Sequence, residues 1–139
     1  MPRYNKTRHE YGTNKEKELK PFLEQIVGEE FRDAEKLYSI FDWETDSFLV
    51  ELKSRTPQYS HDQFSEWLLP SCKADFQTTK QKIFFYYYEK SHKLYRLDYN
   101  PALFKTFKRG VPYGSAQEHL FIPAGAWTEQ KIDGVVRTV

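Results

Sequence analysis

Residues 38–55 place charged side chains inside a predicted β-hairpin. Two runs of aromatic and β-branched residues flank the polar break at residues 45–47, which is the composition of two antiparallel strands joined by a short turn. Asp42, Glu51 and Lys53 interrupt these runs. Burying charges in a strand pair is costly unless they find partners or bind a metal. The three charged residues are therefore candidates for a functional site.

Strand geometry predicts that these charges share one surface. Side chains alternate between faces, so Glu51 and Lys53 point the same way. A turn centred on Asp46 and Ser47 places Asp42 directly across from Glu51. The two carboxylates would repel each other, whereas a divalent cation bound between them would make the interaction favourable. Two carboxylates, a backbone carbonyl and waters form an oxygen-ligand site of the kind that Mg²⁺ uses.

Such a site suits the hydrolysis of phosphodiester bonds, because a bound metal acidifies water and stabilises charge on the leaving oxygen. Lys53 could hold the phosphate or the attacking water, or act as a base if its pKa is lowered. Asp46 is an alternative metal ligand, although an aspartate in a turn usually serves the turn.

An amphipathic helix is predicted ahead of the hairpin. Thr13 and Glu16 have the spacing of a capping box, and apolar residues follow at helical spacing up to Gly28. Pro21 predicts either a kink in one continuous helix, which we favour, or a regular helix that begins only at Lys20. Residues 1–12 lack periodicity and are predicted to form a flexible arm before a domain spanning residues 13–139.

The rest of the chain predicts further strands and short helices. We expect a short helix over residues 60–69, a central strand at 83–88 and a half-exposed strand at 94–99. A helical turn over 102–107 and an edge strand at 120–122 follow. Together these elements predict a single α/β domain with a central mixed sheet of four to five strands flanked by helices.

Composition limits the possible partners and location. The net charge of +1 gives no global basic field, so any binding of nucleic acid must depend on local clusters. We take Arg55, Lys73, Lys80 and Lys82 as candidate contacts to a phosphate backbone. A lone cysteine, the lack of long apolar runs and an N-terminus without an apolar signal core predict a cytoplasmic or nucleoid-associated protein, neither secreted nor in the membrane.

The hairpin residues resemble a known signature. Asp42 followed by Glu51-x-Lys53 is similar to the motif of the PD-(D/E)xK nuclease superfamily, in which Asp, Glu and Lys on adjacent strands form a Mg²⁺-dependent active site. The resemblance covers about residues 12–55, and Phe41 stands where that motif has proline. It implies a restriction-endonuclease-like fold, catalytic roles for all three residues, and Mg²⁺ or Mn²⁺ as the metal.

The first helix extends the resemblance. Gly12-x-x-x-Glu16-x-x-Leu19 is similar to the opening of the first helix in archaeal Holliday-junction resolvases and related enzymes. The likeness implies that Glu16 supplies a further metal carboxylate. Glu18 and Glu24 are possible substitutes on the same helix, and a capping box would explain Glu16 without any catalytic role.

The expected activity is endonucleolytic cleavage of DNA, in the context of DNA recombination or repair. A chain this short leaves no room for a separate sequence-reading module, so we expect recognition of backbone and shape in branched, flapped or junction DNA. A homodimer could supply two sites, and no small-molecule cofactor is expected. The alternatives are a catalytically inactive nucleic-acid-binding module on the same fold and a protein-interaction module.

Overall fold

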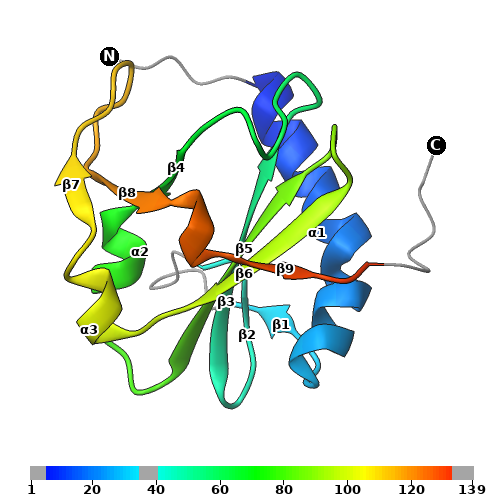
Figure 1. Ribbon diagram of the computed structural model, residues 1–139. Helices are drawn as coiled ribbons and strands as arrows, with labels where there is room; N and C mark the ends of the chain where they lie inside the picture. Colours follow the sequence, from blue (N-terminus) through cyan, green and yellow to red (C-terminus); the bar gives the residue numbers. More distant parts are fainter. Residues whose placement is uncertain (1–5, 35–40, 133–139) are drawn as a thin grey trace.

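A six-stranded mixed sheet forms the centre of the protein. The computed structural model describes residues 6–34 and 41–132 (Figure 1). The strand order in the sheet is β1 (Arg32–Asp33), β2 (Trp43–Glu44), β3 (Phe48–Arg55), β5 (Gln81–Tyr88), β6 (Lys93–Asp98) and β9 (Thr128–Gln130). In this sheet β3 and β5 run parallel, while the other neighbours are antiparallel.

Two layers cover this sheet. Helix α1 (Lys6–Val27) packs on one face. The other face meets a three-stranded sheet in the order β4 (Glu66–Pro70), β8 (His119–Pro123) and β7 (Lys108–Gly110). The helices α2 (Ser71–Asp75) and α3 (Pro101–Phe104) lie with this second sheet, on the opposite side from α1 (Figure 1), and a 3₁₀ turn, Ala124–Ala126, precedes β9. The chain thus forms a single mixed α/β domain.

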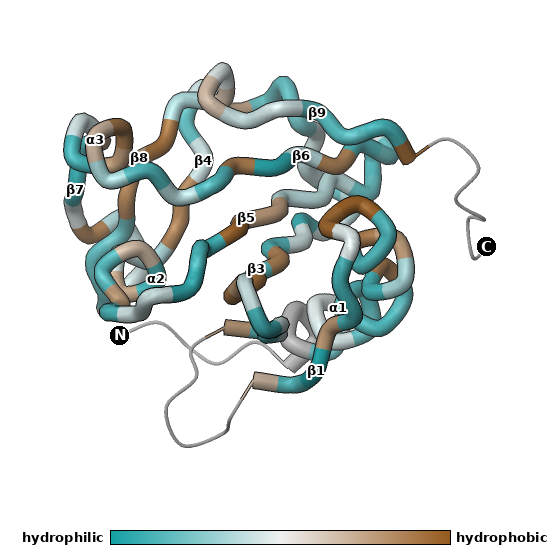
Figure 2. The backbone as a smooth tube through the Cα atoms, turned by 90° about the horizontal axis from the view of Figure 1, so that it is seen from below, coloured by the Kyte–Doolittle hydropathy of each residue, from teal (hydrophilic) through white to brown (hydrophobic). Residues whose placement is uncertain are grey.

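Alternation along the strands builds both cores. Val50 and Leu52 pack with α1, whereas Leu49 joins the cluster beneath the second sheet. Strand β5 is buried on both faces from Lys82 to Tyr88, as expected for a central strand. Figure 2 shows the hydrophobic stretches of β3 and β5 between α1 and the second sheet.

The predicted hairpin register is confirmed. Trp43 pairs with Val50 and Glu44 with Leu49, which is the register of a turn centred on Asp46 and Ser47. The hydrogen-bonded part of the first arm is short, and residues 38–40 of the predicted arm lie outside the described residues.

Helix α1 is continuous through Pro21, as predicted. It ends before Gly28, whose φ of +86° suits glycine and whose N–H bonds to the carbonyl of Glu24 at 2.8 Å.

The predicted helix start at Thr13 is wrong, because α1 begins at Lys6. Residues 6–12, which the sequence pattern assigns to a flexible arm, are helical, and residues 1–5 lie outside the described residues. The Tyr11 hydroxyl donates to the carbonyl of Arg55 at 3.1 Å, which ties this first part of the helix to the end of β3. Thr13 therefore lies inside the helix, and the predicted capping box does not exist.

Three other expectations need correction. The helix predicted over residues 60–69 is wrong, since Trp67 and Leu69 are buried with the period of a strand in β4. Residues 120–122 form a strand, but β8 lies between β4 and β7 rather than at an edge. The central sheet also has six strands instead of four to five, because β1 and β9 are too short to show a pattern. The predicted strand at 94–99 and helical turn near 102–107 are confirmed as β6 and α3.

No helix within the described residues is long and apolar enough to cross a membrane.

Candidate functional site

Asp42 is fastened to β3 by two hydrogen bonds. Its backbone N–H donates to the carbonyl of Val50 at 3.1 Å, and its carboxylate Oδ2 accepts the N–H of Leu52 at 2.8 Å. Strand β2 begins only at Trp43, one residue after Asp42. At Leu52 the carboxylate of Asp42 therefore accepts the backbone N–H of β3. The Asp42 carboxyl group is thereby fixed beside Glu51, which lies between the two bonded residues.

Glu51 is the most deeply placed acid of the site. Its side chain is 13% exposed and contacts the ammonium of Lys73 at 2.8 Å. Burial, followed by the charge of Asp42 and a hydrogen bond to it, raises the pKa of Glu51 well above its usual value, and Lys73 opposes this rise. A hydrogen bond between two carboxyl groups needs a proton on one of them. The raised pKa of Glu51 favours the protonated form, which can donate a hydrogen bond to Asp42.

Helix α1 brings a third carboxyl group to the same place. Glu16 is half-buried, and burial, then the charge of and a hydrogen bond to Asp42, raise its pKa to about 8. The helix begins ten residues earlier, so no capping role explains this glutamate. The two substitutes are engaged elsewhere: Glu18 with Lys15 at 2.9 Å, and Glu24 with the N–H of Phe31 at 2.6 Å.

Lys73 is a part of the site to which the sequence assigns a different role. The predicted role is a contact to nucleic acid, but α2 places the side chain against Glu51 with 18% exposure, and its ammonium lies 5.8 Å from the centre of the Phe41 ring. Its charge opposes the rise in pKa of both Glu51 and Glu16. The sequence signal for this role of Lys73 is electrostatic, because carboxyl groups that lie close together need a cation nearby.

Lys53 lies two residues beyond Glu51 in β3 and is exposed. By the alternation of the strand, it lies on the same face as Glu51. The alternative ligand Asp46 is far more exposed, at 93% of its side chain, and pairs with Arg32 at 3.1 Å beside the turn. Asp42 is thus the hairpin aspartate whose carboxyl group meets Glu51 and Glu16.

The remaining predicted phosphate contacts have structural partners. Lys80 donates to Glu44 at 3.1 Å and to the carbonyl of Thr45 at 2.7 Å. Lys82 is only 5% exposed and donates to the carbonyl of Ala74. We therefore leave both lysines out of the candidate site. Arg55 lies partly exposed on β3, with its guanidinium 4.4 Å from the centre of the Tyr59 ring.

The donor set fits a hard divalent cation, although its present arrangement does not form a cage. Within residues 6–34 and 41–132, no group of three or more His, Cys, Asp or Glu side chains is placed to hold a metal ion. Carboxylate oxygens are nevertheless the ligands that Mg²⁺ prefers. The ammonium of Lys73 contacts Glu51 at 2.8 Å, so a positive charge already lies beside this carboxyl group.

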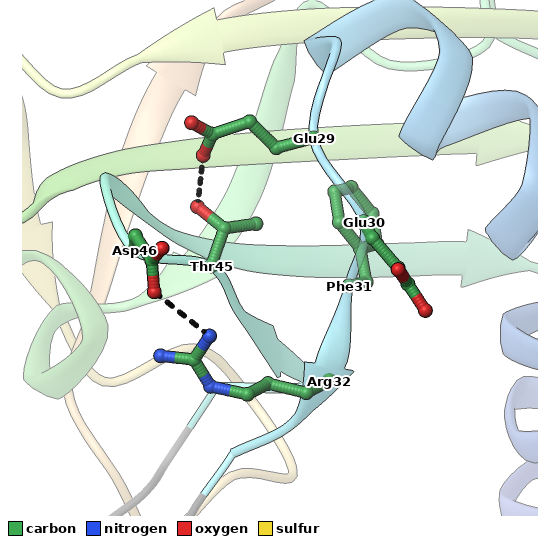
Figure 3. Close-up of a pocket in the computed structure, with 6 residues that line it drawn as sticks. All are labelled: Glu29, Glu30, Phe31, Arg32, Thr45 and Asp46. Carbon is green, nitrogen blue, oxygen red and sulfur yellow. Dashed lines mark hydrogen bonds and ion pairs between the residues drawn. The ribbon is translucent and has the colours of Figure 1, made fainter.

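A separate pocket of about 490 Å³ lies beside the hairpin turn (Figure 3). Its polar side chains bond to one another: Thr45 donates to Glu29, and Arg32 donates to Asp46. These contacts hold the segment after α1 against the turn. The pocket therefore has a structural explanation, unlike the carboxyl groups of Glu16, Asp42 and Glu51.

The sequence matches no protein-family model, and no curated protein is significantly similar to it. Function must therefore be inferred from the chemistry of the site.

Proposed function

We propose that the protein is a metal-dependent endonuclease of the PD-(D/E)xK type that hydrolyses phosphodiester bonds in DNA. One observation carries this proposal: the carboxyl groups of Glu16, Asp42 and Glu51 interact, although they come from a helix, the residue just before β2, and a strand. Like charges in a half-buried place weaken the fold. Strongly raised pKa values at such a cluster are typical of functional sites.

Asp42, Glu51 and Glu16 are the residues that would hold Mg²⁺, or Mn²⁺ in its place, and the bound metal supplies an acidified water and stabilises the leaving oxygen. The hydrogen bond from Leu52 keeps the Asp42 carboxylate in one orientation. Lys73 neutralises part of the carboxylate charge and keeps Glu51 in place.

Lys53 is the residue suited to meet the substrate. It is exposed and lies on the strand face of Glu51, two residues farther along β3. Its ammonium can hold a phosphate oxygen or orient the attacking water. Because the net charge is only +1, affinity for DNA depends on such local contacts, which favours recognition of backbone shape in branched, flapped or junction DNA.

An inactive nucleic-acid-binding module on the same fold is the second candidate. The ion pair between Lys73 and Glu51 favours it, because an ammonium at 2.8 Å occupies a carboxylate that the active enzyme needs as a ligand. The two candidates differ in whether a divalent cation can displace this ammonium.

Cleavage assays separate the candidates. Labelled linear, nicked, flapped and four-way-junction DNA are incubated with the protein, with and without Mg²⁺ or Mn²⁺. We expect metal-dependent cutting that is lost in Asp42→Asn and in Lys53→Ala. Asp46→Asn is the matched control, because it removes an exposed carboxylate of the same hairpin and should cut normally.

Circular dichroism of each variant checks that the fold is kept. Binding without any cutting, unchanged in Asp42→Asn and Lys53→Ala, would favour the inactive module. Cutting that survives Asp42→Asn would refute the proposed site.

A further inference from the structure

An aromatic pocket lies farther along the strand face that carries Glu51 and Lys53. It has a volume of about 100 Å³, and its lining includes Arg55, Trp67 and Tyr88. Arg55 follows Lys53 by two residues and so shares its face. In the parallel pairing of β3 with β5, Tyr88 lies beside Arg55. At about 3.3 Å per residue, Arg55 is about 13 Å from Glu51 along the strand.

Arg55, a residue of the pocket lining, lies beside two further aromatic rings. The guanidinium of Arg55 lies 4.4 Å from the centre of the Tyr59 ring and 5.7 Å from that of Phe64. The two rings are 5.7 Å apart. Phe64 is 39% exposed. Tyr59 is half-buried, so the exposed Phe64 ring beside the guanidinium is the surface on which a further planar group can stack.

The wall of the pocket contains an unused hydrogen-bond donor. The indole Nε1 of Trp67 is buried and, among the described residues, has no hydrogen-bond partner. A buried donor without an acceptor weakens the fold. Glu66, at the end of β4, adds an exposed carboxylate to the lining. The pocket thus offers the exposed Phe64 ring, the Glu66 carboxylate as an acceptor and the Arg55 cation, and its wall includes the buried Trp67.

From these features we infer that the pocket binds one unpaired nucleobase of the strand that runs past the carboxyl groups. A nucleobase is planar, carries ring acceptors and amino donors, and is attached to a phosphate that Arg55 or Lys53 can contact. A volume of about 100 Å³ holds one ring system and not a base pair. At about 3.4 Å per nucleotide of a stacked strand, 13 Å corresponds to about four nucleotides.

This inference rests on the proposed function for the choice of nucleic acid as the ligand, and it narrows the substrate. DNA that is unpaired close to the cleavage point, as in flaps and junction arms, is preferred to an intact duplex. Base binding itself requires neither the metal nor the carboxyl groups, so it can be measured in the absence of cleavage.

The test compares Phe64→Ala and Tyr59→Ala with Tyr113→Ala, which removes a fully exposed tyrosine of another loop. The probes are a single-stranded DNA and a flapped duplex, each with 2-aminopurine in the unpaired part, and a blunt duplex. Binding is measured in EDTA, where no metal-dependent cutting occurs. The wild-type protein should change the 2-aminopurine fluorescence on binding.

We expect Phe64→Ala and Tyr59→Ala each to weaken binding of unpaired DNA about tenfold or more, which is the usual effect of removing a stacking ring. Binding of the blunt duplex and the behaviour of Tyr113→Ala should not change. An equal loss for duplex and unpaired DNA, or no loss at all, would overturn the inference.

The pocket and the nuclease can fail independently. Base binding that depends on Phe64, without cutting in any metal, refutes the nuclease and keeps the pocket. Metal-dependent cutting with unchanged Phe64→Ala binding refutes the pocket and keeps the nuclease. The absence of DNA binding refutes the inference, and an aromatic side chain of a protein partner then becomes the alternative ligand of the pocket.

Discussion

Replacing Lys73 by methionine tests whether the carboxyl groups strain the fold. The change keeps most of the side-chain volume and removes the charge that faces Glu51 at 2.8 Å. Removing one partner of a fully buried ion pair costs about 3–5 kcal/mol, whereas an exposed pair contributes about 0–1 kcal/mol. The side chains of Lys73 and Glu51 are 18% and 13% exposed. Because Glu51 can also relieve its charge by binding a proton, we expect a loss of about 2 kcal/mol at pH 8.

The loss should depend on pH in a definite direction. Burial and Asp42 raise the pKa of Glu51 above its ordinary 4.5. Between 4.5 and the raised pKa, the unfolded chain binds fewer protons than the folded one, so stability falls as the pH rises. Loss of Lys73 raises the pKa further and widens this range. As the pH falls toward 4.5, Glu51 takes up a proton in the unfolded chain as well, so the expected loss shrinks to below about 0.5 kcal/mol at pH 5.

Urea unfolding at pH 5 and pH 8 measures both values. Lys93→Met is the matched control, because Lys93 pairs with Glu129 at 3.4 Å and both side chains are more than a third exposed. It should change stability by less than about 0.5 kcal/mol at either pH. If Lys73→Met lowers the free energy of unfolding equally at the two pH values, the cause is lost packing. If it has no effect at pH 8, the charges of the carboxyl groups do not destabilise the fold.

Three further perturbations probe the site and the fold. Mg²⁺ at ten times its dissociation constant should stabilise the wild-type protein by about 1.4 kcal/mol and leave Asp42→Asn unchanged, as measured by thermal unfolding; equal effects would exclude Asp42 as a ligand. Burial and Asp42 raise the pKa of Glu16 to about 8, so its charge weakens the fold as the pH rises above 4.5. Glu16→Gln should therefore be more stable than the wild type by about 1–2 kcal/mol at pH 9 and equal at pH 4, in urea unfolding; a loss at pH 9 would contradict this sign. Leu23→Ala removes a fully buried side chain of α1 and should cost about 3 kcal/mol at any pH, whereas a loss below about 1 kcal/mol would mean that α1 packs loosely.

Local sequence patterns account for the elements that position the carboxyl groups. The turn residues set the hairpin register, so the pairing of Asp42 with Glu51 follows from the sequence of the turn and its two arms. Residues 83–88 are predictable as a central strand because apolar side chains fill both faces. Glu16 is also among the candidates, but its spacing from Thr13 offers a false explanation as a capping box. Only the true start of α1 removes that explanation.

Tertiary contacts supply what local patterns cannot. Lys73 lies on a five-residue helix, and its contact with Glu51 is set by how the chain returns from the second sheet to β5. The segment ending in Trp67 and Leu68 has helical spacing, yet pairing with β8 makes it a strand. Pairing between distant segments overrides weak local preferences of this kind.

The balance of charge explains why such a cluster is more readily understood as a functional site than as support for the fold. Well-packed apolar residues would stabilise this position at least as well as ionisable ones. Lys73 brings one positive charge to the carboxyl groups of Glu16, Asp42 and Glu51, so protons must balance part of the remainder at neutral pH. A divalent cation would take the place of the ammonium and of protons on these carboxyl groups, while the hydrogen bond from the N–H of Leu52 keeps Asp42 oriented. Under the proposed function, this excess of negative charge is where the metal ion would bind.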